Sequence, residues 1–232
     1  MKRPRLYVFS PSHFCERARW ALQHRGIPFD EVALAPGPHV VQARGMGARS
    51  EVPFLRTRSD IVQGSGAILD WAGLDGGDPE LEDRVAKNLA VAGRRMVYAG
   101  LLNETPGHAA ELLFSRVRGA AGLAGRAAWP ITRRLMIRAM RTQLVHIAAL
   151  EQRIAGELTW LAGRIAGRDY LVGGCFGRAD LTVASLLSLL VLPERCAIYA
   201  SVVVPPVLRP LFERWREHPV AVYVRRIYAV HR

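Results

Sequence analysis

The chain has 232 residues, half of them hydrophobic, and a formal net charge of +12. This is enough apolar material for one large core or two modest ones. No apolar run reaches the length of a transmembrane helix, and the N-terminus has no apolar signal core. Three cysteines, Cys15, Cys175 and Cys196, give an odd number without metal-ligand spacing, which indicates a reducing compartment. We therefore expect a soluble, unprocessed, cytoplasmic protein without a metal centre.

The positive charge comes from 30 arginines and only two lysines. Such a bias is more typical of genome composition than of nucleic-acid binding, so no nucleic-acid partner is expected. The arginines are unevenly placed, however, because residues 112–150 contain seven arginines and no acidic residue. This segment could dock on an anionic membrane surface or on an acidic protein.

The first predicted elements are a strand and a helix joined by a short turn. An apolar run, Leu6 to Phe9, ends at Ser10-Pro11-Ser12, and the apolar residues after it recur at helical spacing from Phe14 to Leu22. The first backbone NH groups of such a helix have no internal partner and carry the positive end of its dipole. The turn is therefore suited to binding an anion or a thiolate.

Two side chains at this helix start, a hydroxyl and a thiol, match the positions of a redox motif. Ser12 and Cys15 form the pattern Ser-x-x-Cys, which is a redox Cys-x-x-Cys motif with a hydroxyl at its first, nucleophilic position. Capping the helix is the simpler role for Ser12, and Ser10 is a competing hydroxyl. Cys15 lacks a cysteine partner at position 12, so we interpret it as a small packed residue rather than a redox centre.

The next elements complete a familiar order. We expect a strand over 29–34, a loop with a ragged short helix over 36–50, a hairpin of 53–55 with 61–62, and a helix capped by Ser65. The order β-α-β followed by β-β-α is that of a thioredoxin-like domain. The glycine-rich residues 73–77 then mark a linker.

The rest of the chain is predicted to be all helical. Asp78-Pro79 combines a cap with a proline at the first helical position, and a continuous apolar face runs from Leu81 to Met96. A second long helix is expected from Ile147 to Ile165. Gly177 is predicted to cap a further helix, with Asp180 bonding back to its free NH groups in a structural role. The expected domains are a thioredoxin-like α/β domain over 1–76 and an all-α domain over 79–232.

Several stretches resemble the glutathione transferase family. The run SPSHFCERARWALQHRGIPFDEVAL looks like the family's first strand, helix and second strand, and three later motifs follow in the family's order: Val52-Pro53, Gly64-Ser65-Gly66-Ala67-Ile68 and Tyr170-Leu171-Val172-Gly173-Gly174. The resemblance covers nearly the whole chain and is most specific over its first 75 or so residues. It is closest to a bacterial branch with serine at the catalytic turn, similar to the zeta and tau classes.

The resemblance implies a set of glutathione contacts: Ser12, Val52, Pro53, Gln63, Gly64 and Ser65. Ser12, five residues before Arg17, would donate a hydrogen bond to the glutathione thiolate. Pro53 would adopt a cis bond, so that the backbone of Val52 pairs with the cysteinyl part of the tripeptide. Ser65 would bind the γ-glutamyl carboxylate, and Arg49 could reach the glycyl carboxylate.

One departure from the family pattern affects this binding site. The family usually has an acidic residue just before the serine at position 65, and this chain has Gly64 there, with Gln63 before it. The ammonium group of glutathione would lose its carboxylate partner, so affinity would be low unless Gln63 partly substitutes.

Three functions follow as hypotheses. The first is a cytoplasmic, homodimeric glutathione transferase of detoxification, which uses glutathione as co-substrate and attacks a small hydrophobic electrophile at an interdomain site. The hydroxyl bond to the thiolate would lower the thiol pKa by roughly one to two units. The second is a non-catalytic relative that docks through residues 112–150, and the third is a glutathione-dependent reductase that uses Cys15.

Overall fold

The computed structural model describes residues 3–232, and these residues divide into two compact units. The sheet unit comprises the described residues up to Leu74 together with Ala110–Thr132, and the helical unit comprises Asp75–Ala109 and Arg133–Arg232. A thioredoxin-like N-terminal domain is thus followed by a helical region, which confirms the predicted fold class. The division into continuous domains over 1–76 and 79–232 stays a prediction.

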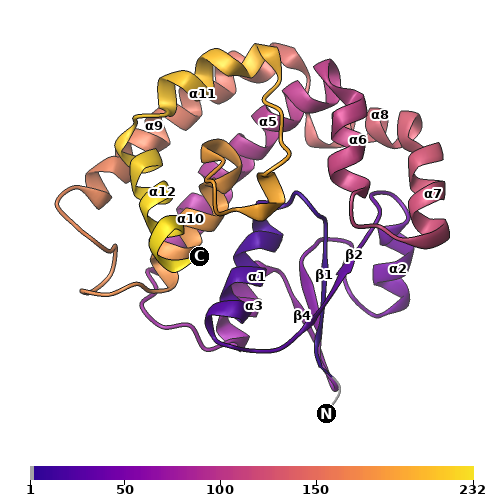
Figure 1. Ribbon diagram of the computed structural model, residues 1–232, viewed down its shortest axis with the longest axis horizontal. Helices are drawn as coiled ribbons and strands as arrows, with labels where there is room; N and C mark the ends of the chain where they lie inside the picture. The colour runs from indigo at the N-terminus through magenta and orange to yellow at the C-terminus, as the bar shows by residue number, and fades with distance from the viewer. Residues whose placement is uncertain (1–2) are drawn as a thin grey trace. The chain divides into compact units, whose positions relative to one another are not determined.

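The elements are shown in Figure 1. The strands are β1 (Arg5–Val8), β2 (Asp30–Ala33), β3 (Phe54–Arg56) and β4 (Ile61–Gln63). The helices near the sheet in sequence are α1 (His13–His24), α2 (His39–Gly45) and α3 (Ser65–Trp71). The later helices are α4 (Pro79–Arg84), α5 (Val91–Glu104), α6 (Pro106–Phe114), α7 (Gly119–Ala127), α8 (Trp129–Met140), α9 (Ile147–Ile165), α10 (Arg178–Val191), α11 (Arg209–Trp215) and α12 (Pro219–His231). A π-helical segment, η1 (Val85–Ala90), and three 3-10 turns, η2 (Leu144–His146), η3 (Ala197–Tyr199) and η4 (Pro206–Leu208), complete them.

The sheet has the order β2-β1-β3-β4, with β1 parallel to β2 and antiparallel to β3. Side chains alternate between its faces, as strand geometry requires. Tyr7 and Phe54 stack at 4.5 Å between ring centroids on the face where Ala43 of α2 packs. Leu6 and its partner Leu55 are fully buried on the opposite face, which α1 and α3 cover (Figure 1).

The first helices of the helical unit follow from local sequence signals. Asp78 Oδ1 accepts a hydrogen bond from the Leu81 NH at 3.0 Å, and Pro79 stands at the first helical position, as predicted. The predicted helix over 81–96 is one helical path, in which a π-helical segment, Val85–Ala90, lies between α4 and α5.

The helix α10 forms the centre of the helical unit. Asp180, which has no exposed surface, accepts hydrogen bonds from the NH groups of Gly177 at 2.9 Å and Leu171 at 2.8 Å, and from the hydroxyl of Tyr223. Burial and this hydrogen bond both raise the pKa of Tyr223. The predicted structural role of Asp180 is confirmed. None of the helices in residues 3–232 combines the length and apolar character that crossing a membrane requires.

Candidate functional site

Sheet register brings the predicted glutathione contacts to one end of the sheet unit. Tyr7 of β1 pairs with Phe54 of β3, and Phe54 pairs with Gln63 of β4. Because β3 runs antiparallel to both neighbours, the turn after β1, the segment before β3 and the residues after β4 meet at this end. Segments separated by some 50 residues in sequence therefore lie next to one another.

Ser12 lies at the start of α1 and caps it. Its backbone is extended (φ −87°, ψ 120°), and its Oγ accepts a hydrogen bond from the Cys15 NH at 3.3 Å. The side chain is partly exposed, whereas the competing Ser10 is buried. An oxygen that accepts a cap bond keeps its own proton for donation. The Ser12 hydroxyl therefore caps the helix and keeps one proton, which it can donate to an external acceptor in place of the Cys15 sulfur.

Cys15 points into the core. It has no exposed surface, and burial raises the pKa of its thiol to about 11, although a hydrogen bond with Ser12 and the charge of Arg19 act in the opposite direction. A thiol with this pKa is neutral at physiological pH and is not a nucleophile. This geometry favours the interpretation of Cys15 as a packed residue.

The peptide bond between Val52 and Pro53 is cis, as the family resemblance implied. Pro53 is buried, and its carbonyl accepts a hydrogen bond from the Gly64 NH at 2.9 Å. This bond joins the segment before β3 to the start of α3. Val52 is partly exposed at the same end of the sheet.

The start of α3 differs from the sequence prediction. Gly64, not Ser65, is the residue that precedes the helix, and Ser65 is its first residue. Gly64 has φ +91° and ψ 154°, a backbone conformation that glycine adopts without strain. The position of a helix cap depends on the backbone dihedral angles of the capping residue, and the presence of a serine at position 65 does not determine them. Ser65 is 6% exposed, and its NH is one of the unbonded groups at this helix start.

The side-chain amide of Gln63 is engaged within the protein. Its Oε1 accepts from the Arg49 NH at 2.9 Å, and its Nε2 donates to the Glu51 carbonyl at 2.7 Å. These two bonds hold the loop that leads into Val52. The Arg49 side chain is 75% exposed and lies 3.6 Å from a carboxylate oxygen of Glu51.

Sequence reasoning used Arg17 only as a spacing mark and missed its place in the site. Arg17 is 5% exposed, and its Nη1 lies 3.9 Å from the position that a Cβ on Gly66 would occupy. A buried positive charge thus stands beside the first turn of α3. The signal was present, since Arg17 follows Ser12 by one and a half helical turns.

A buried ion cluster supports α1 from its other side. Arg19 contacts the carboxylates of Glu16 at 2.7 Å and Glu31 at 2.6 Å, and Glu31 also binds Arg116 at 3.0 Å. Burial alone would raise the pKa of Glu31, but the hydrogen bond from Arg19 and the charges of both arginines bring it below its ordinary value. The pairing of Glu31 with Arg116 spans 85 positions, so sequence spacing could not predict it.

Two surface cavities of the sheet unit lie along β2. One, of about 630 Å³, is lined by Glu31, Val32, Ala33, Ser115, Arg116 and Arg118. The other, of about 490 Å³, lies between β2, α2 and residues 117–121. Neither is lined by a predicted glutathione contact. Within residues 3–232, no group of three or more histidine, cysteine or acidic side chains could hold a metal ion.

A comparison with protein families matches residues 6–78 to the model "Glutathione S-transferase, N-terminal domain". The matched range contains the sheet apart from Arg5, the helices α1 to α3 and all six predicted glutathione contacts. No curated protein sequence matches the chain significantly.

Solved structures of the same fold are distant in sequence. The chain is 12% identical to the glutathione S-transferase CsGST63524 of Ceriporiopsis subvermispora, solved with glutathione, with a TM-score of 0.60 and coverage of 99% of this chain and 98% of that one. It is 15% identical to a glutathione S-transferase from Xanthobacter autotrophicus Py2, with a TM-score of 0.58 and coverage of 98% and 93%. It is 17% identical to glutaredoxin 2 from Salmonella typhimurium, also solved with glutathione, with a TM-score of 0.55 and coverage of 99% and 100%. Residues 6–78 therefore form a glutathione S-transferase N-terminal domain.

Proposed function

We propose that the protein is a glutathione transferase that conjugates the glutathione thiolate to a small hydrophobic electrophile. The observation that carries this proposal is the placement of a partly exposed, proton-bearing Ser12 hydroxyl at the sheet end where Val52, Pro53 and Ser65 also lie. Glutathione is bound in the two related structures described above as solved with it.

In the proposed mechanism, Ser12 stabilises the ionised sulfur. A free thiol with a pKa of about 8.5 is only roughly 3% ionised at pH 7. A hydrogen bond from the hydroxyl to the charged sulfur contributes about 1.5 to 3 kcal/mol, and the positive end of α1 adds to it. The thiolate then attacks the electrophilic carbon, forms the carbon–sulfur bond and expels the leaving group with its electron pair.

The other contacts orient the tripeptide. The backbone of Val52 would pair with the cysteinyl part, and the NH and hydroxyl of Ser65 would bind the γ-glutamyl carboxylate, with the Arg17 charge close by. Gly64 offers no charge to the ammonium group. Gln63 would act indirectly by holding the loop of Arg49 and Glu51.

The remaining parts of the proposal extend the assignment to the whole protein. We infer a homodimer that acts in detoxification in the cytoplasm. A glutathione-dependent reductase is a weaker candidate, because the Cys15 thiol is fully buried and its pKa is about 11.

The test compares wild type with Ser12→Ala, Ser65→Ala and the exposed control Ser201→Ala. Calorimetry gives the affinity for glutathione, and ultraviolet absorbance of the thiolate gives the pKa of the bound thiol. We expect Ser12→Ala to raise that pKa by roughly one to two units and to lower turnover of a nitroaryl halide on the order of tenfold to a hundredfold, with little loss of affinity. Ser65→Ala should lower affinity instead.

Three results would count against the proposal. Unchanged turnover in Ser12→Ala would remove Ser12 from the mechanism. Absence of glutathione binding to the folded wild type would favour the non-catalytic alternative. Reductase activity that disappears in Cys15→Ser would instead revive the redox hypothesis.

A further inference from the structure

The outer face of α8 exposes apolar and basic side chains in adjacent rows. Ile131 is 66% exposed and Leu135 is 62% exposed, and with the exposed Ala139 they stand four residues apart on one ridge of the helix. Arg134 and Arg138, also exposed, form the neighbouring ridge, three residues after Ile131 and Leu135 respectively.

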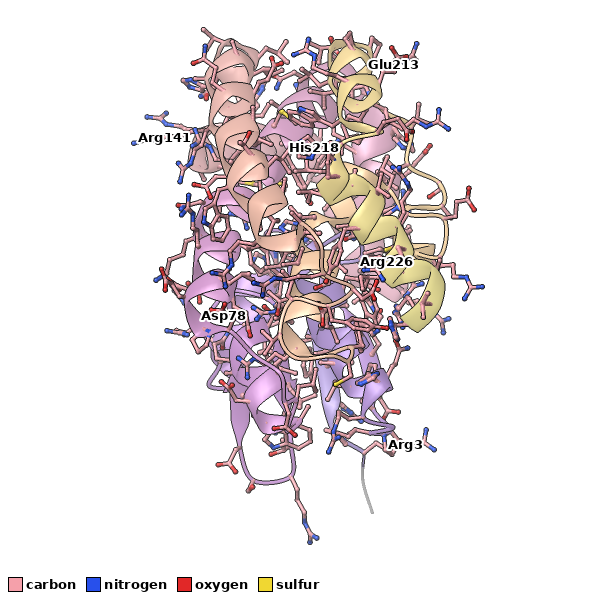
Figure 2. The ribbon with its side chains drawn as sticks, turned by 90° about the vertical axis from the view of Figure 1, so that its left-hand side faces the viewer. Arg3, Asp78, Arg141, Glu213, His218 and Arg226 are labelled. Atoms are coloured by element: carbon pink, nitrogen blue, oxygen red, sulfur yellow. The ribbon has the colours of Figure 1, made fainter. Side chains whose placement is uncertain are left out.

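Exposed apolar and basic side chains also follow α8 in the sequence. Arg141 is exposed and projects from the surface in Figure 2, and the following turn exposes Leu144 by 41% and Val145 by 80%. Exposed large apolar side chains are thus interleaved with arginines over 131–145.

The inner side of this segment is fixed to α5. Arg133 Nη1 donates to the Leu102 carbonyl at 2.6 Å, and Asn103 Nδ2 donates to the Thr142 carbonyl at 2.9 Å. Arg95 Nη2 donates to the Arg141 carbonyl at 3.3 Å. The outer face is therefore presented on an anchored helix, and its exposure does not result from a detached end.

The charges of this face are unneutralised. The guanidinium groups of Arg134 and Arg138 form no ion pair or hydrogen bond with any residue in the described range 3–232, and residues 112–150 contain no acidic side chain. A second copy docking through this same face would bring its own Arg134 and Arg138 against these arginines, and the like charges would repel each other. The complementary partner is a surface that offers negative charge together with an apolar interior.

We propose that residues 131–145 dock the protein peripherally on an anionic phospholipid bilayer. Ile131 and Leu135 would enter the boundary between head groups and acyl chains, while Arg134 and Arg138 extend alongside to lipid phosphates. This role is independent of the proposed transferase activity, because none of these residues is a predicted glutathione contact.

The experiment measures sedimentation of the full-length protein with vesicles of phosphatidylcholine, with and without phosphatidylglycerol. Wild type should bind only the anionic vesicles and should be released by high salt. Arg134→Ser with Arg138→Ser should weaken binding about 25-fold, since each arginine near a charged membrane contributes roughly fivefold. Ile131→Ser with Leu135→Ser should weaken it on the order of tenfold or more.

Matched controls come from exposed residues outside this segment. Arg168→Ser with Arg195→Ser removes the same charge, and Val222→Ser with Val230→Ser removes exposed apolar groups on α12. Both controls should bind like wild type. Absence of binding to anionic vesicles, equal binding to neutral vesicles, or equal losses in controls and test variants would each overturn the proposal. Calorimetry with glutathione on the α8 variants tests the glutathione site separately. Unchanged glutathione affinity would show that a loss of vesicle binding does not come from damage to that site.

Discussion

The carboxylate of Glu31 connects distant segments of the sheet unit. It stands on the edge strand β2 and pairs with Arg19 of α1 and with Arg116, which follows α6. Its side chain is 19% exposed and that of Arg19 is 6% exposed. Removing one partner from such a cluster leaves a buried charge partly uncompensated.

We expect Glu31→Gln to destabilise the protein by about 2 kcal/mol at neutral pH, because Glu16 still partners Arg19. The folded-state pKa of Glu31 lies below its ordinary value of 4.5, so the carboxylate stabilises the fold above that value. This stabilisation is lost as pH falls through the lowered folded-state pKa. Denaturant unfolding at several pH values should show the difference between wild type and variant shrinking in acid; a difference independent of pH would contradict the assignment.

Two substitutions of Gly64 separate the effect of backbone strain on stability from the effect of an added charge on glutathione binding. Its φ of +91° disfavours any residue with a Cβ, yet an added Cβ would meet no atom within 4 Å. Gly64→Ala and Gly64→Glu should therefore both lower stability by about 1 to 2 kcal/mol. If the glutathione ammonium lies here, Gly64→Glu should bind glutathione more tightly than Gly64→Ala in calorimetry. Equal affinities would place the ammonium elsewhere.

At the scale of elements, the sequence predicted what local signals determine. Asp78-Pro79 marked the start of α4, and the apolar spacing from Ile147 to Ile165 matched α9, because caps and periodicity act within a few residues. The start of α3 was misplaced by one residue, since the cap depends on the dihedral angles of Gly64. The position of Arg17 beside α3 and the partner of Glu31 are tertiary contacts, which no local pattern encodes.

The helix α7 provides a test of element packing. A Cβ on Gly125 would lie 2.6 Å from a ring carbon of Phe114, whereas a Cβ on Gly156 in α9 would meet nothing within 4 Å. Gly125→Ala should cost about 1 to 3 kcal/mol because the aromatic ring must move. Gly156→Ala should stabilise by about 0.5 to 1 kcal/mol, as alanine is the better helix former. Thermal unfolding of both variants shows whether each substitution lowers or raises stability. A stabilising Gly125→Ala would mean that α7 shifts away from Phe114 without cost.

At the scale of the whole molecule, the sheet unit is not continuous in sequence. Residues 110–132 cluster with the residues up to Leu74, although 35 residues of the helical unit lie between them. They supply Arg116 to Glu31 and place Gly125 of α7 close to Ala35, because an added Cβ would lie 3.4 Å from the alanine methyl group. They also line the cavities beside β2. The thioredoxin-like part of this chain therefore has a contact partner that its own 76 residues do not contain.

We expect a fragment of residues 1–76 to be markedly less stable than the same residues within the full chain. It would lose the Arg116 partner of Glu31 and would expose Ala35, which is 1% exposed in the whole protein and lies beside Gly125 of α7. At about 25 cal/mol per Å² of apolar surface returned to water, a few kcal/mol is a large share of the stability of so small a domain. Hydrogen exchange of the β1 and β2 amides in the fragment and in the full chain measures the difference. Equal protection in the two would show that residues 110–132 only rest against a domain that is stable without them.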